Sequence, residues 1–235
     1  MNIFIGELLG SFLLVLLGNG VVANVVLTKT KGNNSGWIVI TLGWAMALFV
    51  AVFVASKFSG AHLNPAVSVA MVMMGKIASS DLPQYFGGQF LGCLVGALAV
   101  WIAYRQHFDA TQNQGSQLAA FSTGPEIRNS AANLTTEIVG TFILVLGVLF
   151  IISPDPSLGA IDALPAAFLI LAIGLGLGGP TGFAINPFRD LCPRIMHSIL
   201  PMTNKGSSDW GYAWIPVVGP FIGAILAAVV FKALP

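Results

Sequence analysis

Two stretches decide the fold of this chain: Ser59-Gly-Ala-His-Leu-Asn64-Pro65-Ala66 and Gly182-Phe-Ala-Ile-Asn186-Pro187-Phe188. Each places Asn-Pro at the start of a short apolar segment, over about 65–75 in the first and about 187–198 in the second. An Asn side chain can accept hydrogen bonds from the free amides of a helix N-terminus, and Pro is favoured in the first turn. Each stretch therefore predicts the start of a helix that is too short to cross a bilayer.

The rest of the composition is that of an integral membrane protein. Of the 235 residues, 56% are hydrophobic and 8% are charged, whereas about 25% of a typical soluble domain is charged. Several apolar runs are long enough to cross about 30 Å of hydrocarbon. With a net charge of +1 and no basic cluster, the chain offers no site for nucleic acid. We expect spanning helices at about 3–27, 36–56, 83–104, 133–153, 163–179 and 211–233.

The chain also contains an internal repeat. Glu7-Leu-Leu-Gly10 resembles Glu137-Ile-Val-Gly140, and the two Asn-Pro pairs follow in the same order. Each half, 1–104 and 133–235, thus carries three spanning segments and one short segment, and a polar connection, 105–132, joins them. Three crossings per half require the second half to enter from the opposite face. We predict one all-α channel domain over 1–235, with six transmembrane helices and two re-entrant half-helices in an inverted repeat.

Two half-helices that enter from opposite faces would meet near the bilayer centre, with non-helical chain before each. Exposed backbone at that depth is tolerated only where it lines a water-filled cavity. We expect extended backbone whose carbonyl groups line the path, and the side-chain amides of Asn64 and Asn186 at the centre. The predicted lining carbonyls belong to Gly60, Ala61, His62, Leu63, Gly182, Ala184 and Ile185. The pattern predicts a pore for small neutral molecules.

These motifs resemble the signature of the major intrinsic proteins, the aquaporin family, along essentially the whole chain. The resemblance places a selectivity filter at Trp44, Gly174, Phe183 and Arg189. This set is similar to that of the glycerol facilitators, whereas water channels usually carry Phe and His at the first two positions. It implies that Trp44 and Phe183 form an apolar corner, that Gly174 leaves space, and that Arg189 donates to hydroxyls; alternatively, Arg189 pins a loop. In aquaporin-type pores, opposed helix dipoles exclude cations and protons.

The remaining polar residues have competing interpretations. Glu7 and Glu137 suggest a proton relay, but the resemblance implies that they support the two re-entrant loops. Asp190 is expected to support the second loop near Arg189. His62 is expected to fix the first loop and not to bind a metal. We predict no metal site and no cofactor.

One departure from the family pattern concerns the residue after the second Asn-Pro. The family usually has Ala there, and Phe188 would place a large ring where the half-helices abut. We expect that a smaller neighbour compensates, or that the pore centre is displaced or narrowed.

The expected function is passive conduction of glycerol and water, and of other small neutral solutes such as dihydroxyacetone, urea or undissociated lactic acid. The alternative is a proton-coupled secondary transporter, because inverted repeats with broken helices also build transporters. An enzyme is not expected, since no nucleophile, base and metal set can be placed around the cavity. The resemblance implies a homotetramer with its N-terminus inside the cell. The short termini and loops favour a multi-pass protein of a bacterial plasma membrane, although the Lys and Arg bias taken alone would place the N-terminus outside.

Overall fold

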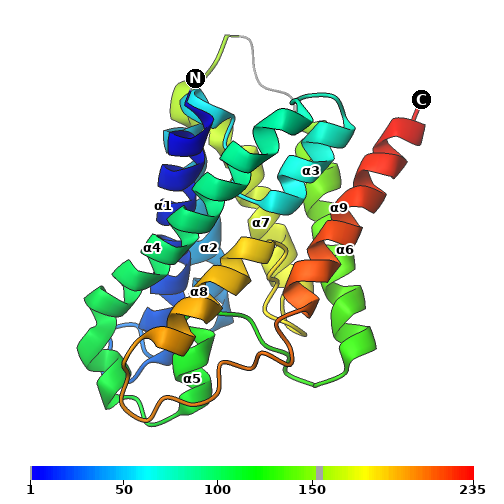
Figure 1. The fold of residues 1–235 in the computed structure, drawn as a ribbon. Helices are drawn as coiled ribbons and strands as arrows, with labels where there is room; N and C mark the ends of the chain where they lie inside the picture. Colours follow the sequence, from blue (N-terminus) through cyan, green and yellow to red (C-terminus); the bar gives the residue numbers. More distant parts are fainter. Residues whose placement is uncertain (1, 152–155) are drawn as a thin grey trace.

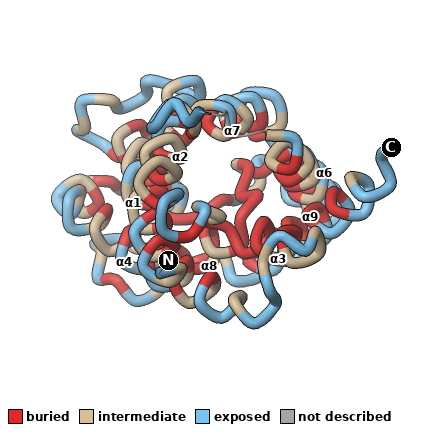
Figure 2. The backbone as a smooth tube through the Cα atoms, turned by 90° about the horizontal axis from the view of Figure 1, so that it is seen from above, coloured by how far each residue is buried: buried red, intermediate tan, exposed pale blue. Residues whose placement is uncertain are grey.

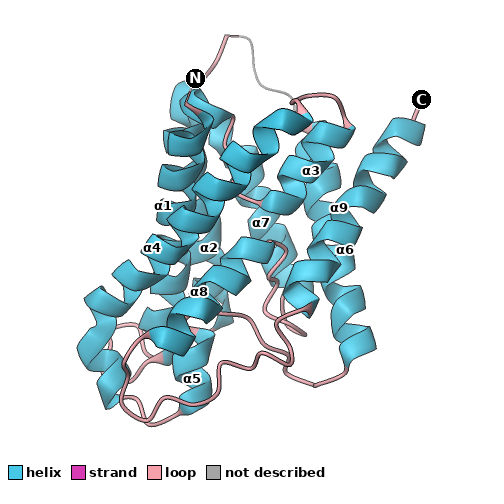
Figure 3. Ribbon diagram, in the orientation of Figure 1, coloured by secondary structure: helices cyan, strands magenta, loops and turns pink. Residues whose placement is uncertain are grey.

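The protein is described by a computed structural model that covers residues 2–151 and 156–235, and all regular structure in these ranges is helical (Figure 3). Six of the helical segments are long and apolar enough to cross a membrane, as predicted. The α-helices are α1 (Ile3–Val26), α2 (Trp37–Ser59), α3 (Pro65–Met73), α4 (Leu82–Ala110), α5 (Gln114–Ala119), α6 (Ser130–Phe150), α7 (Leu164–Leu177), α8 (Pro187–Ile199) and α9 (Ile215–Ala233). Short 3-10 turns, η1 (Ser79–Asp81) and η2 (Gly159–Ala163), precede α4 and α7.

The predicted half-helices are α3 and α8, and both begin at the proline of an Asn-Pro pair. The boundaries of the spanning helices differ more from the prediction. Helix α4 continues to Ala110 instead of ending at 104, and α5 lies in the polar connection. Hydropathy marks where the hydrocarbon ends, whereas a helix with polar residues can continue into water. Positions 152 and 153 of the predicted 133–153 segment lie outside the described residues.

The long helices pack in the same way in both halves of the chain. Helix α1 packs against α2 and α4, and α6 packs against α7 and α9 (Figure 1). Glycines permit the closest approaches. A Cβ atom added at Gly96 of α4 would lie 2.8 Å from the carbonyl oxygen of Phe12, and one at Gly219 of α9 would lie 2.7 Å from Cβ of Glu137. These glycines therefore let the helices approach more closely than any residue with a side chain would allow.

The half-helices occupy opposite ends of the molecule. In Figure 1, α3 lies in the half nearer the chain termini and α8 in the other half, and both termini are at the same end. Seen from above in Figure 2, the buried segments gather on the inner sides of the surrounding helices. Helix α3 contacts α4 and α9, and α8 also contacts α4 and α9, so the same two helices support both half-helices. The starts of α3 and α8 are thereby brought face to face.

Candidate solute pore

Both half-helices are capped by the asparagine that precedes them. Oδ1 of Asn64 accepts a hydrogen bond from the amide of Ala66 at 3.0 Å. Oδ1 of Asn186 accepts from the amides of Phe188 at 3.1 Å and Arg189 at 3.2 Å. These bonds satisfy amides that have no partner within a helix. The Asn-Pro pairs therefore act as helix starts deep inside the molecule.

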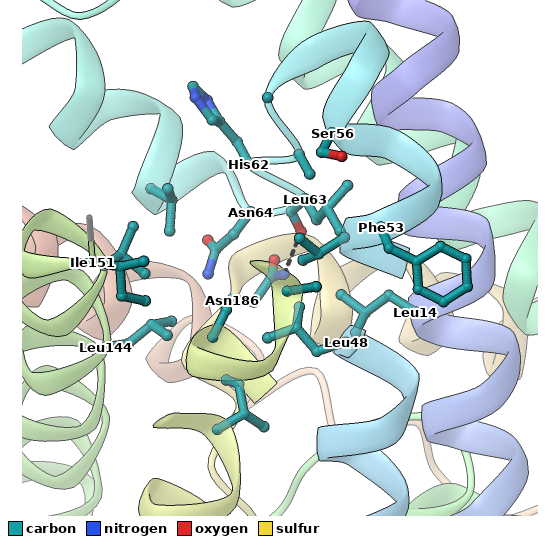
Figure 4. Close-up of a pocket in the computed structure, with 18 of the residues that line it drawn as sticks. Leu14, Leu48, Phe53, Ser56, His62, Leu63, Asn64, Leu144, Ile151 and Asn186 are labelled. Atoms are coloured by element: carbon teal, nitrogen blue, oxygen red, sulfur yellow. Dashed lines mark hydrogen bonds between the residues drawn. The ribbon is translucent and has the colours of Figure 1, made fainter. Parts of the chain in front are cut away.

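The same two asparagines join the loops across the centre. Nδ2 of Asn64 donates to the carbonyl oxygen of Ile185 at 2.7 Å, and Nδ2 of Asn186 donates to that of Leu63 at 2.8 Å. Figure 4 shows both side chains beside the cavity. A side-chain amide carries two N–H groups, so each asparagine keeps one N–H that this cross-connection does not use.

The loops before the half-helices are not extended, which corrects the expectation from sequence. Several of their residues have a left-handed backbone with φ between 41° and 83°. They are Gly60, Ala61 and Leu63 in the first loop, and Gly182, Phe183 and Ile185 in the second. This conformation costs roughly 1–2 kcal/mol for each residue that is not glycine. With this backbone, each loop turns two of its amides toward a buried carboxylate.

Two buried carboxylates hold the first and second loops in this conformation. Glu7 accepts hydrogen bonds from the amides of His62 at 3.0 Å and Leu63 at 2.7 Å. Glu137 accepts from the amides of Ala184 at 3.1 Å and Ile185 at 2.8 Å. Charge-assisted bonds of this kind are stronger than neutral ones. The carboxylates thus offset the strain of the two loops.

Hydroxyl groups at the start of each loop complete this arrangement, and sequence reasoning did not assign them a role. Ser59 donates to Glu7 at 2.6 Å, and Thr181 donates to Glu137 at 2.7 Å. A signal was available, because the two residues stand at the same spacing from their asparagines. The amide of Gln89 on α4 also donates to Glu7, at 2.7 Å. Position 220, at the corresponding place on α9, is a proline, so the repeat gave no hint of Gln89.

His62 is held from behind the first loop. Its Nδ1 lies 3.1 Å from the hydroxyl of Ser68, and its ring stacks on Tyr85 with the centroids 4.2 Å apart. The hydroxyl of Tyr85 donates to the carbonyl oxygen of Ser59 at 2.7 Å. The sequence gave no reason to single out Tyr85. Within the described ranges, no three His, Cys, Asp or Glu side chains are grouped so that they could hold a metal ion.

Asp190 contacts Thr123 and Arg194. Its carboxylate accepts from the amide and hydroxyl of Thr123, both at 2.7 Å, and from Nε of Arg194 at 2.9 Å. Thr123 belongs to the connection between the halves and lies behind Gly182, where an added Cβ would be 3.3 Å from Cβ of Thr123. Among the described residues, Thr123 therefore connects Asp190 to the second loop.

A cavity of about 540 Å³ runs along the loops (Figure 4). Lys57 and Asp162 line it near the end that carries the chain termini, and Trp44, Phe183 and Arg189 line it at the other end. The predicted pore residues that line it are Gly60, Ala61, His62, Leu63, Asn64, Ala184, Ile185 and Asn186. Gly174 and Gly182 were also predicted to face the path, but they do not belong to its lining.

Three of the four predicted filter residues meet at the far end of this cavity. The guanidinium carbon of Arg189 lies 4.1 Å from the centroid of the Trp44 ring, and both side chains are buried. Gly174 acts differently from expectation. A Cβ atom there would lie 2.9 Å from the methyl of Thr41 and 3.1 Å from Cζ of Phe183. Its missing side chain thus makes room for the Phe183 ring and does not open the cavity directly.

Phe188 does not enter the pore, so the predicted displacement or narrowing of the pore centre by its ring is wrong. Its ring packs edge-to-face on Phe86 and Phe90 of α4, with centroids 5.9 and 5.4 Å apart. Cys192, one helical turn further on, is buried in the same cluster as Phe90. Position 188 therefore lies on the side of α8 that faces α4, and Arg189 lies on the side that faces the cavity.

Comparisons with known proteins agree with this geometry. The model of the family described as Major intrinsic protein matches residues 1–231. The chain is 54% identical over 232 residues to the glycerol uptake facilitator protein of Streptococcus pneumoniae R6, covering 99% of each chain. It is 40% identical over 228 residues to a D/L-lactic acid transporter of Lactiplantibacillus plantarum, covering 95% of this chain and 94% of the relative.

Among solved structures, the X-ray structure of the aquaglyceroporin from Plasmodium falciparum superimposes with a TM-score of 0.87 at 32% sequence identity. The match covers 99% of this chain and 96% of that one. The similarity therefore extends over the whole set of helices and both pore loops. The chain belongs to the major intrinsic protein family.

Proposed function

We propose that the chain is a passive channel that lets glycerol, water and other small neutral solutes cross a bacterial plasma membrane. The observation that carries this proposal is the end of the cavity, where one cationic side chain and two aromatic rings form its wall. The relatives support the choice of solute, since one at 54% identity is named glycerol uptake facilitator protein and one at 48% identity is named probable glycerol uptake facilitator protein.

The proposed filter matches a solute that has a carbon chain on one side and hydroxyls on the other. Trp44 and Phe183 offer apolar faces to the carbon chain. No acceptor within the described ranges is hydrogen-bonded to the Arg189 guanidinium, so its N–H groups are free to donate to hydroxyls. Gly174 contributes by making room for the Phe183 ring beside α7.

Beyond the filter, a solute would exchange hydrogen bonds along the loops. The carbonyl groups of Gly60 to Leu63 and of Ala184 and Ile185 are the proposed acceptors, and Asn64 and Asn186 are the proposed donors at the centre. Glu7 and Glu137 are proposed to hold the loops and not to carry protons, because each carboxylate oxygen already accepts from a loop or its neighbours.

Ions are excluded in this proposal by two positive elements. The starts of α3 and α8 each carry about half an elementary charge from the helix dipole, and they meet at the centre. The fixed charge of Arg189 adds a second barrier at the filter. Neutral solutes do not experience this repulsion, so the proposed pore selects solutes by charge as well as by size.

We also propose the arrangement of the whole domain: inverted repeats 1–104 and 133–235 joined by 105–132, a homotetramer, and an N-terminus inside the cell. Labelling of a cysteine placed near a terminus, with membrane-impermeant reagents in intact cells, would test the orientation. Mass measurement in lipid nanodiscs would test the tetramer.

Reconstitution into vesicles tests the function. Swelling in glycerol should be much faster with the protein than in protein-free vesicles, and water flux should show the low activation energy of a pore. Lactic acid, offered at two pH values, should enter in proportion to its undissociated fraction. Glycerol uptake no faster than in protein-free vesicles would refute the proposal. Accumulation of solute above equilibrium under an imposed proton gradient would also refute it, because a channel can only equilibrate.

A further inference from the structure

A second tryptophan on α2 lies just outside the proposed filter. Trp37 is the first residue of α2, and Trp44 is the eighth. Seven residues make about two helical turns, or about 10.5 Å along the axis. The two side chains therefore lie on one side of α2, with Trp37 one level further out. Trp37 is 40% exposed, whereas Trp44 is 3% exposed.

The indole of Trp37 is fixed by a hydrogen bond to the last turn of α7. Its Nε1 donates to the carbonyl oxygen of Gly174 at 3.1 Å. Helix α7 ends at Leu177, so Gly174 is one of the four residues whose carbonyls have no partner inside the helix. The bond satisfies a free carbonyl and ties the start of α2 to the end of α7.

The same indole also packs on the ring of Phe183. The two rings meet edge-to-face, with centroids 5.8 Å apart and planes at 84°. They meet over Gly178, where an added Cβ would lie 2.6 Å from Cδ1 of Phe183 and 2.8 Å from Cζ2 of Trp37. The Phe183 ring thus packs against the backbone of Gly174 and Gly178 on one side and against the indole of Trp37 on another.

We propose that Trp37 is a positioning residue that determines selectivity by holding the Phe183 ring in the filter. The inference rests on the proposed function, because it assigns to Trp37 the placement of one filter wall. The Phe183 ring packs edge-to-face on Trp37 and lies over Gly178, so Trp37 is one of the neighbours that fix its position. A fixed ring fits a carbon chain before the solute arrives, which favours glycerol over water.

A tryptophan at a membrane surface commonly serves as an interfacial anchor. Trp214 provides a matched control, because it precedes α9 at the same end of the molecule, is 44% exposed and makes no side-chain hydrogen bond within the described ranges. An anchoring role would make the two tryptophans equivalent. A positioning role would make only Trp37 affect the solute ratio.

The experiment measures the ratio of glycerol to water permeability in vesicles, which does not depend on the number of folded channels. Trp37→Phe keeps a ring against Phe183 and removes the N–H donor. We expect it to lower the ratio about fivefold, the factor that loss of one ordinary hydrogen bond corresponds to. Trp37→Ala should lower it further, and Trp214→Phe and Trp214→Ala should leave it unchanged.

A double variant separates positioning from other effects. In a Phe183→Ala background there is no ring to position, so Trp37→Phe should no longer change the ratio. An unchanged ratio in Trp37→Phe, an equal shift in Trp214→Phe, or an undiminished shift in the Phe183→Ala background would overturn the inference. If the wild-type protein fails to conduct glycerol, the proposed function fails and this inference with it. If it conducts but any of those three results is found, the inference fails alone.

Discussion

Gly174 allows a quantitative test of how the filter is built. Replacement by Ala would place a Cβ atom 2.9 Å from the methyl of Thr41 and 3.1 Å from Cζ of Phe183. Carbon atoms pack at about 3.5–4.0 Å, so both neighbours must move by roughly half an ångström. Thr41 is fully buried on α2, and the Phe183 ring borders the cavity. The ring should therefore yield and narrow the path.

Overpacking of this size costs about 1–3 kcal/mol. If the barrier to glycerol passage through the filter rises by that amount, Gly174→Ala should reduce glycerol permeability by about 5- to 160-fold. Water is smaller and should be affected less, so the glycerol to water ratio should fall. Stopped-flow light scattering of vesicles, with a glycerol gradient and then an impermeant osmolyte, measures both quantities on one preparation.

Gly176 supplies the matched control on the same helix. An added Cβ there meets no heavy atom within 4 Å. Both substitutions gain the same helix propensity, about 1 kcal/mol, so the difference between them isolates the contacts at Gly174. Equal ratios in Gly174→Ala and Gly176→Ala would refute the reasoning, because they would show that the space beside Gly174 does not govern passage.

Three further substitutions and one control substitution test the supports of the pore. Glu137→Gln leaves at least one amide of the second loop without an acceptor, so its detergent melting temperature should fall by the equivalent of about 1–3 kcal/mol; an unchanged melting temperature would contradict loop support. Phe188→Ala should destabilise the protein by about 0.5–1.5 kcal/mol for each edge-to-face ring pair lost, yet leave the glycerol to water ratio intact. A shifted ratio would show that the Phe188 ring reaches the pore. Arg194→Ala leaves the buried carboxylate of Asp190 without its ion-pair partner and should lower the free energy of unfolding by about 3–5 kcal/mol. Arg128→Ala breaks an exposed ion pair and should lower it by less than about 1 kcal/mol. Equal thermal shifts in these last two would contradict the assignment.

The sequence was sufficient to predict the helices and the centre of the pore, because these depend on local chemistry. An apolar run of spanning length indicates a transmembrane helix, and an Asn-Pro pair before an apolar segment indicates a helix start, whatever the rest of the chain does. The repeat added the inference that Asn64 and Asn186 face each other, and their reciprocal hydrogen bonds to the opposite loops are seen in the structure.

What could not be predicted depends on which way a side chain or carbonyl points. The sequence shows a large residue at Phe188 but not that it faces α4. It shows glycine at position 174 but not that a neighbouring ring occupies the vacant space. Gln89 and Trp37 lack counterparts in the other half, so the repeat could not draw attention to them. Their roles arise only from the packing of distant helices.

The reciprocal hydrogen bonds of Asn64 and Asn186 have a consequence for the synthesis and membrane insertion of the protein. The carbonyl of Leu63 receives its donor from a residue 123 positions later, which the ribosome has not yet made when the first three helices enter the bilayer. A chain that lacks Asn186 therefore has no donor for the Leu63 carbonyl, and we expect its opening to be incomplete. Completion of the conduit coincides with insertion of the last elements, so a chain truncated before Asn186 should leave vesicles as tight to glycerol as bare lipid.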